Sequence, residues 1–184
     1  TKLGILPGIK VDKGAKQLAN TENEKITDGL DGLRDRLKEY YELGARFAKW
    51  RAVITIGDNM PTAYCISANA HALARYAALC QEQGLVPIVE PEILMDGAHT
   101  IDESYQLTTE TLYNVFYELV SQGVELEGIV LKPNMVLSGY DCSDQASVEQ
   151  VAEMTVDCFL NTVPAVVPGI AFLSGGQSDE LATA

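Results

Sequence analysis

Five short apolar runs divide the chain into units of nearly constant length. Polar residues at the ends of these runs recur every 41 or 42 residues, as at Lys49, Glu90, Lys132 and Ser174. Each run contains β-forming residues or closes on Gly or Pro, which is typical of strands. We therefore expect five strands, over residues 3–10, 45–56, 85–90, 128–132 and 169–174.

Between these runs, apolar residues recur at the spacing of one helix face. The spacing predicts four helices, which are marked by Leu33 and Leu37, Leu73 and Ala77, Leu112 and Val115, and Val151 and Met154. Ser147 and Gln150, three positions apart, open the fourth helix with the spacing of a capping box.

The alternation of strands and helices predicts a parallel sheet. A nearly constant unit that brings a polar group to each strand end is the signature of a (β/α) barrel. A doubly wound sheet is the alternative, but it usually carries a glycine-rich turn after its first strand, where this chain has Gly14 alone. A complete (β/α)8 TIM barrel has eight strands and typically about 250 residues. We expect residues 1–184 to form a single domain, an incomplete barrel of five consecutive βα units without the N-terminal strands and the last strand.

Charge and cysteine content narrow the classes of function. The 13 Lys and Arg residues and 26 Asp and Glu residues give a formal net charge of −13. Such a surface repels nucleic acid and anionic membranes, and no apolar run approaches the roughly 20 residues of a membrane span. Four cysteines without a C-x-x-C pair and only two histidines argue against a metal site and fit reduced thiols in a cytoplasmic protein.

Several charged residues lie in runs that should be apolar. A parallel strand covered on both faces is apolar throughout, and an unpaired charge within it is costly. Because side chains alternate along a strand, Lys49 and Arg51 should lie on the side opposite Trp50. By the same rule Glu90 and Glu92 should share one side of their strand.

If these sides face the mouth of the barrel, four cations meet the two carboxylates there. The cations are Lys10, Lys49, Arg51 and Lys132, four of the 13 basic residues. Such a positive cluster suits an anionic ligand, most simply a phosphate. The alternative is a structural network of ion pairs between strand ends.

Lys132 is a lone cation in an otherwise apolar run. Desolvation and a neighbouring cation such as Lys49 would both favour its neutral amine form. A neutral amine can attack a carbonyl carbon, which would explain the cost of placing a lysine there. Glu90 is the nearest candidate for the proton transfers that forming and breaking an imine require.

The tripeptide Ser174-Gly175-Gly176 ends the last run and precedes a helix that could begin at Gln177. Two glycines let backbone N–H groups approach an anion closely, and a helix N-terminus adds its dipole. Alternation should place Phe172 on the same side as Ser174. We expect this turn to bind a phosphate.

Five segments of the chain together resemble class I fructose-bisphosphate aldolase, the Schiff-base form. They follow the family's order and spacing, and they are GIKVDKG (8–14), FAKWR (47–51), VPIVEPEI (86–93), LKPNMV (131–136) and FLSGGQS (172–178). The resemblance implies a homotetrameric glycolytic barrel enzyme without metal or cofactor. Its reaction would be the reversible cleavage of fructose 1,6-bisphosphate to dihydroxyacetone phosphate and glyceraldehyde 3-phosphate.

Carried onto this chain, the resemblance assigns four catalytic residues. Lys132 would form the imine, and Glu90 would be its acid/base partner. Lys49 would support proton transfer and cleavage of the C–C bond, and Glu92 would belong to the same cluster.

The resemblance also assigns residues that bind the sugar phosphate. Lys10 and Arg51 would contact phosphate or substrate oxygens, and Ser174 and Gly175 would bind the phosphate of the ketose half. Family members are longer, and this chain lacks their first two strands and the phosphate-binding Gly-Arg of their last strand. Two alternatives stay open: another Schiff-base or phosphate-handling barrel enzyme, and a catalytically silent scaffold that keeps the barrel motifs.

Overall fold

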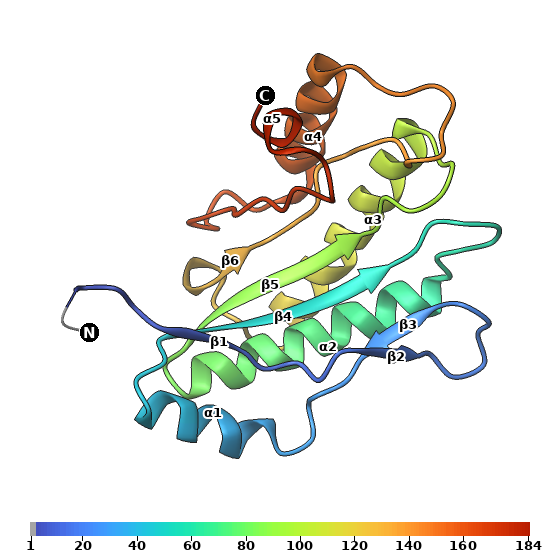
Figure 1. Ribbon diagram of the computed structural model, residues 1–184. Helices are drawn as coiled ribbons and strands as arrows, with labels where there is room; N and C mark the ends of the chain where they lie inside the picture. Colours follow the sequence, from blue (N-terminus) through green and yellow to red (C-terminus); the bar gives the residue numbers. More distant parts are fainter. Residues whose placement is uncertain (1–2) are drawn as a thin grey trace.

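A computed structural model describes residues 3–184 and shows a parallel sheet with helices along it (Figure 1). The sheet contains β1 (Gly8–Lys10), β4 (Phe47–Ile54), β5 (Val86–Ile93) and β6 (Val130–Leu131), and the strands neighbour one another in that order. Every adjacent pair is parallel, with Lys10 opposite Lys49 and Arg51 opposite Glu90. The strands thus follow chain order, as the repeating βα pattern predicts.

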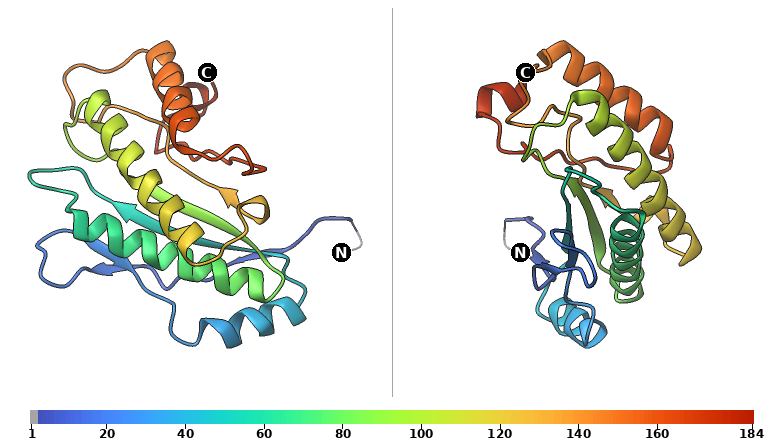
Figure 2. Two further views of the ribbon diagram at one scale, coloured as in Figure 1. Left: turned by 180° about the vertical axis from the view of Figure 1, so that it is seen from behind. Right: turned by 90° about the vertical axis from the view of Figure 1, so that its right-hand side faces the viewer.

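The predicted helices all form. They are α1 (Leu33–Glu42), α2 (Ala63–Glu82), α3 (Ile101–Ser121) and α4 (Val148–Thr162), followed by the short α5 (Asp179–Thr183), and a 3₁₀ turn η1 (Leu126–Gly128) precedes β6. Helix α2 packs on β4 and β5, α3 packs on α2, and α4 packs on α3 (Figure 2). The predicted capping box of Ser147 and Gln150 opens α4. Within residues 3–184, no helix has both the length and the apolar character needed to cross a membrane.

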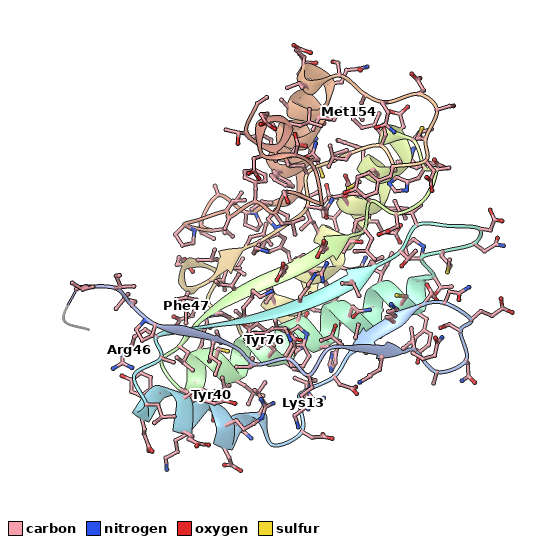
Figure 3. All side chains as sticks on the ribbon, in the orientation of Figure 1. Lys13, Tyr40, Arg46, Phe47, Tyr76 and Met154 are labelled. Atoms are coloured by element: carbon pink, nitrogen blue, oxygen red, sulfur yellow. The ribbon has the colours of Figure 1, made fainter. Side chains whose placement is uncertain are left out.

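The apolar core lies between the sheet and the helices, where α2 contributes the largest share and α1, α3 and α4 add further buried residues. In β4, the buried residues Ala48 and Trp50 alternate with the partly exposed Lys49 and Arg51, as strand geometry predicts. Trp50 stacks on Tyr76 of α2 with ring centroids 5.5 Å apart. The Tyr76 hydroxyl donates a hydrogen bond of 2.7 Å to the Ala48 carbonyl oxygen, so this buried phenol satisfies its donor (Figure 3).

The structure also contains an antiparallel pair, β2 (Ala15–Gln17) and β3 (Lys25–Thr27), that the sequence pattern does not predict. Each strand has three residues, too few to show a period in the sequence. A tertiary contact holds the pair in place: the buried carboxylate of Glu24 accepts hydrogen bonds from the N–H and the hydroxyl of Thr62, the N-cap of α2.

The first and last predicted strands are shorter than expected. Only Gly8–Lys10 of the first run pairs in the sheet. The run 169–174 lies parallel to β6, but a single bridge between Leu131 and Ile170 represents it. The Leu131 N–H donates a hydrogen bond of 3.1 Å to the Gly169 oxygen, and the Ala171 N–H donates one of 2.9 Å to the Leu131 oxygen. Because Pro133 has no N–H, the β6 ladder cannot continue in this direction.

Candidate active site

Residues on one face of β4 and β5, together with residues that follow β5 and β6, line a pocket of about 430 Å³. Its lining includes seven of the eight predicted site residues: Lys49, Arg51, Glu90, Glu92, Lys132, Ser174 and Gly175. Parallel strands place their carboxyl ends at one edge of a sheet, which is where barrel enzymes carry their active sites. The recurrence of polar residues every 41 or 42 positions therefore corresponds to one shared pocket.

Glu90 lies between two lysines at the centre of the pocket. Its Oε2 is 2.6 Å from the Lys49 Nζ, and its Oε1 is 2.5 Å from the Lys132 Nζ. The Glu90 side chain is only 3% exposed, whereas the side chains of Lys49 and Lys132 are 29% and 25% exposed. A carboxylate within hydrogen-bond reach of both amines can take a proton from either, which suits acid/base work at an amine.

The surroundings of Lys132 differ from the sequence expectation. The prediction of a lone cation inside an apolar strand is wrong, because β6 ends at Leu131 and Lys132 pairs with Glu90. The Lys132 N–H still donates to the Val89 oxygen at 2.7 Å, so β5 fixes the lysine backbone. The case for a reactive amine therefore rests on the proton acceptor beside it and not on apolar burial.

Arg51 and Glu92 form a second ion pair beside this cluster. The Arg51 Nε donates to Glu92 Oε2. This hydrogen bond raises the pKa of Arg51 above its usual value, so the guanidinium stays charged at any physiological pH. The arginine side chain is 42% exposed, and among the described residues 3–184 nothing accepts a hydrogen bond from its Nη groups. Those groups are available to an anion in the pocket.

Lys10, the eighth predicted site residue, is not among the residues that line the pocket. It lies opposite Lys49 in the sheet, but its Nζ is 2.5 Å from Asp12 Oδ1. Asp12 also accepts hydrogen bonds from the backbone N–H groups of Gly14 and Arg51. In the structure, the ion-pair partner of Lys10 is thus Asp12 and not a carboxylate of the pocket. The predicted convergence of four cations is therefore reduced to three.

The charges that line the pocket are balanced. Three cations face three carboxylates there, because Asp96 joins the two predicted glutamates. The expected excess of positive charge is absent from this lining, and every lining cation has a carboxylate partner. The alternative of an ion-pair network thus describes the geometry without a ligand, although one carboxylate shared by two amines is also an arrangement for proton transfer.

The turn Ser174-Gly175-Gly176 forms one wall of the pocket. Gly175 and Gly176 have φ angles of +61° and +86°, which glycine adopts without the penalty of a side chain. The Gly176 N–H lies 3.4 Å from the Ser174 Oγ. Helix α5 begins only at Asp179 and caps its own end through Ser178, so the turn itself, without the predicted helix dipole, would bind an anion.

Phe172 does not share a side with Ser174, which corrects the alternation predicted for this segment. It stacks on Phe159 with ring centroids 5.8 Å apart and lines a separate cavity of about 260 Å³. Alternation fails because the segment pairs through one bridge only and is not a regular strand. The side chains that line this second cavity carry no ionisable group, which leaves it without acid/base chemistry.

Apart from Leu173, which directly precedes the predicted turn, four residues of the pocket wall are not predicted from the sequence: Leu94, Met95, Asp96 and Tyr140. They come from the loops that follow β5 and β6, beyond the strand ends that the spacing marks. The one local signal was an aromatic residue after the turn-forming pair Ser138-Gly139, which does not by itself indicate a site.

The remaining reactive groups lie elsewhere. Burial raises the pKa of the Cys65 thiol to about 11 and that of Cys80 to about 12, so both stay protonated and unreactive at neutral pH. In the part of the chain that the structure describes, no three His, Cys, Asp or Glu side chains group so that they could hold a metal ion. The chemistry of the pocket is that of two amines, a guanidinium and carboxylates.

Known proteins resemble this chain over its whole length. The family model described as "Glycolytic: Fructose-bisphosphate aldolase class-I" covers residues 1–184. A probable fructose-bisphosphate aldolase class 1 of Xanthomonas axonopodis pv. citri is 64% identical over 184 residues, which are 100% of this chain and 55% of that protein. A cytosolic fructose-bisphosphate aldolase 4 of Arabidopsis thaliana is 56% identical over 98% of this chain and 46% of its own length.

A solved structure extends the match to three dimensions. The fructose-bisphosphate aldolase of Plasmodium falciparum, crystallised with TRAP and a small-molecule inhibitor, superposes with a TM-score of 0.96 and 51% identity. The match covers 99% of this chain and 53% of that one, and the chain spans about half the length of the curated relatives it matches. The predicted fold, five consecutive units of a (β/α)8 barrel, is confirmed. By its sequence, its fold and its match over residues 1–184, the chain belongs to the class I fructose-bisphosphate aldolase family.

Proposed function

We propose that the full-length protein carrying this chain cleaves fructose 1,6-bisphosphate reversibly through an imine on Lys132. The products are dihydroxyacetone phosphate and glyceraldehyde 3-phosphate. One observation carries the proposal: in a chain of the aldolase family, the Glu90 carboxylate lies within 2.5 Å of the Lys132 Nζ and 2.6 Å of the Lys49 Nζ, inside the pocket.

Imine formation requires Lys132 to lose a proton before it attacks. Glu90 is placed to accept that proton from the Lys132 ammonium. The free amine then attacks the ketose carbonyl carbon, and the carbonyl oxygen leaves as water after proton transfers for which Glu90 and Lys49 lie within reach. The result is a protonated imine that attracts electrons from the neighbouring carbon.

Cleavage uses that electron demand. A base takes the proton of the C4 hydroxyl, the C3–C4 bond breaks, and its electron pair moves to the imine as an enamine while the aldehyde leaves. Protonation of the enamine and hydrolysis by water return dihydroxyacetone phosphate and the free Lys132. The cluster of Lys49, Glu90 and Glu92 beside Lys132 supplies the ionisable groups for these transfers.

The phosphates of the substrate need fixed donors. The turn at Ser174 and Gly175 supplies a hydroxyl and backbone N–H groups at the pocket wall, and Arg51 supplies free Nη groups. We propose that Lys10 contributes in the full-length protein by exchanging its Asp12 partner for a substrate oxygen, since its side chain is 53% exposed.

Borohydride trapping tests the function directly. The full-length protein is incubated with dihydroxyacetone phosphate and borohydride, and the mass of the reduced ligand is sought on the peptide that carries Lys132. A label on Lys49 or Lys10 would reassign the roles within the same fold. Absence of any adduct, together with loss of cleavage on addition of a chelator, would refute the Schiff-base mechanism.

We also propose a cytoplasmic homo-oligomer, a tetramer by analogy with the family, that handles sugar phosphates and contacts neither nucleic acid nor membrane. Support comes from the net charge of −13, from relatives named as cytosolic, and from apolar side chains exposed on α3 and α4, including Tyr117, Val120 and Leu160. Residues 1–184 would act as one incomplete barrel domain. Light scattering on the full-length protein tests the assembly, and a monomer at micromolar concentration would contradict it.

A further inference from the structure

Two loops at the pocket edge are joined through their backbones. The Tyr140 N–H donates to the Met95 oxygen at 2.9 Å, and the Gly139 N–H donates to the His99 oxygen at 2.8 Å. The loops can approach this closely because Gly139 has no side chain: a Cβ there would collide with the carbonyl of Gly97. The loop after β6 is therefore held against the loop after β5, and the position of Tyr140 is fixed.

From that position Tyr140 reaches the glycine turn. Its hydroxyl donates a hydrogen bond to the Gly175 carbonyl oxygen. The hydroxyl end of its side chain lies so close to Gly176 that a Cβ on that glycine would collide with the Tyr140 hydroxyl. On the other side, a Cβ on Gly175 would lie 3.1 Å from the Met95 Cγ. The turn thus lies between Met95 and Tyr140, both of which line the same pocket.

The hydrogen bond from Tyr140 fixes the plane of one peptide group. In a trans peptide the C=O and the N–H point to opposite sides. With the Gly175 carbonyl directed to Tyr140, the Gly176 N–H must point away from it, toward the Ser174 Oγ at 3.4 Å. Without the Tyr140 hydroxyl, this peptide would lose the hydrogen bond that fixes its carbonyl, and the Gly176 N–H would be free to change direction.

We propose that Tyr140 is a positioning residue that holds the Ser174–Gly176 turn in the orientation that binds the phosphate of the ketose half, and so determines affinity for that phosphate. The inference rests on the proposed function of the pocket. Tyr140 lies more than 30 residues from the turn in sequence, and its hydroxyl donates to the turn from outside the segment 172–178.

A Tyr140→Phe substitution removes that hydroxyl and leaves the ring. Tyr140 is 52% exposed, so we expect the variant to fold with an unchanged melting temperature. The matched control is Tyr113→Phe, because the Tyr113 hydroxyl also donates to a backbone carbonyl, that of Asn161 at 3.1 Å, but on the α3–α4 surface outside the pocket.

The experiment measures kcat, KM and inhibition by inorganic phosphate in the full-length protein. Loss of one hydrogen bond that orients the turn should raise KM for fructose 1,6-bisphosphate and the inhibition constant of phosphate about five- to tenfold in Tyr140→Phe. The kcat and the borohydride adduct on Lys132 should stay at the wild-type level, because the hydroxyl does not touch the reacting carbon. Tyr113→Phe should change none of these values.

Two results would overturn the inference while leaving the proposed function intact. One is a KM and phosphate inhibition in Tyr140→Phe equal to those of Tyr113→Phe, with normal trapping on Lys132. The other is a fall in kcat and adduct formation without a change in phosphate inhibition, which would place Tyr140 in the chemical step. A wild-type protein that forms no adduct would instead refute the proposed function itself.

Discussion

The two faces of β4 carry opposite environments within a single strand. On the pocket face, Lys49 and Arg51 are partly exposed and pair with carboxylates of β5. On the other face, Trp50 is fully buried and stacks on Tyr76 of α2. Successive side chains point to opposite faces of a strand, so one residue separates an ion pair from the apolar core. A substitution on the face of Lys49 and Arg51 should therefore affect the chemistry of the pocket, and a substitution on the face of Trp50 should affect stability.

The energetic reason is that the two faces are stabilised differently. Burial of a large aromatic side chain contributes about 1.5–3 kcal/mol or more through removal of apolar surface from water. The carboxylates on the pocket face are buried, so the attraction within their ion pairs is largely offset by desolvation. Removal of one lysine beside Glu90 leaves that carboxylate with its second lysine, whereas truncation of Trp50 leaves a cavity in the core.

The largest effect should come from Lys132→Met in the full-length protein. Without its amine no imine can form, so both the borohydride adduct and the cleavage should be abolished. The unfolding midpoint should stay close to that of the wild type, because Glu90 retains Lys49 as a partner. Mass spectrometry of the trapped peptide and a coupled cleavage assay check this.

Lys13→Met is the control, since Lys13 lies outside the residues that line the pocket. It should leave both adduct and cleavage at the wild-type level. A Lys132→Met protein that still forms the adduct would show that another amine does the chemistry.

The next effect should come from Glu90→Gln, which keeps the shape of the side chain and removes its proton-accepting charge. We expect kcat to fall about 10²- to 10⁴-fold, the usual contribution of general acid–base catalysis. The adduct should form more slowly and still map to Lys132. The exposed Glu127→Gln, on η1 outside the pocket, serves as control, and an unchanged kcat in Glu90→Gln would remove Glu90 from the mechanism.

On the apolar face, Trp50→Ala should lower the free energy of unfolding by about 3–5 kcal/mol, because it leaves a cavity against Tyr76. Urea unfolding at fixed protein concentration measures the change. Tyr64→Ala, at a side chain 51% exposed, should change stability by less than about 0.5 kcal/mol. Equal losses in the two variants would show that the buried Trp50 contributes no more to stability than an exposed aromatic side chain.

The smallest effect should come from Tyr76→Phe in α2, on the apolar side of β4. This substitution deletes the hydroxyl that donates to the Ala48 and Ile88 carbonyl oxygens. We expect a loss of about 1–2 kcal/mol at neutral pH. Burial raises the pKa of Tyr76 well above its usual value, so above pH about 10 the unfolded chain releases a proton that the folded chain keeps.

Stability from this raised pKa is fully present below pH about 10 and declines as the pH rises further. The loss of stability between neutral and alkaline pH should therefore be smaller in Tyr76→Phe than in the wild type. Urea unfolding at several pH values compares the two proteins. An equally steep alkaline loss in both would show that Tyr76 does not keep its proton in the folded state.

Much of the fold could be predicted because its signals are local and repeated. The periods of α2, α3 and α4 and the capping box at Ser147 depend on residues a few positions apart. The β2–β3 pair escaped because three-residue strands have no period, and a contact between Glu24 and Thr62, 38 positions apart, holds the pair in place. Phe172 escaped because its segment never becomes a regular strand.

The amino-acid sequence alone predicts the order of strands and helices, the alternation along β4, and the convergence of Lys49, Glu90 and Lys132 on one pocket. These properties follow from residue spacing and from the geometry of parallel strands, so no long-range detail is needed.

Three-dimensional packing sets the partner of each polar group. Lys10 pairs with Asp12 and not with a residue of the pocket. Lys49 and Lys132 share the Glu90 carboxylate, and Tyr140 contacts Gly175. A hydrogen bond requires its donor and acceptor to meet within a few tenths of an ångström. That distance is set by how loops pack on one another, and the spacing of residues along the chain does not contain it.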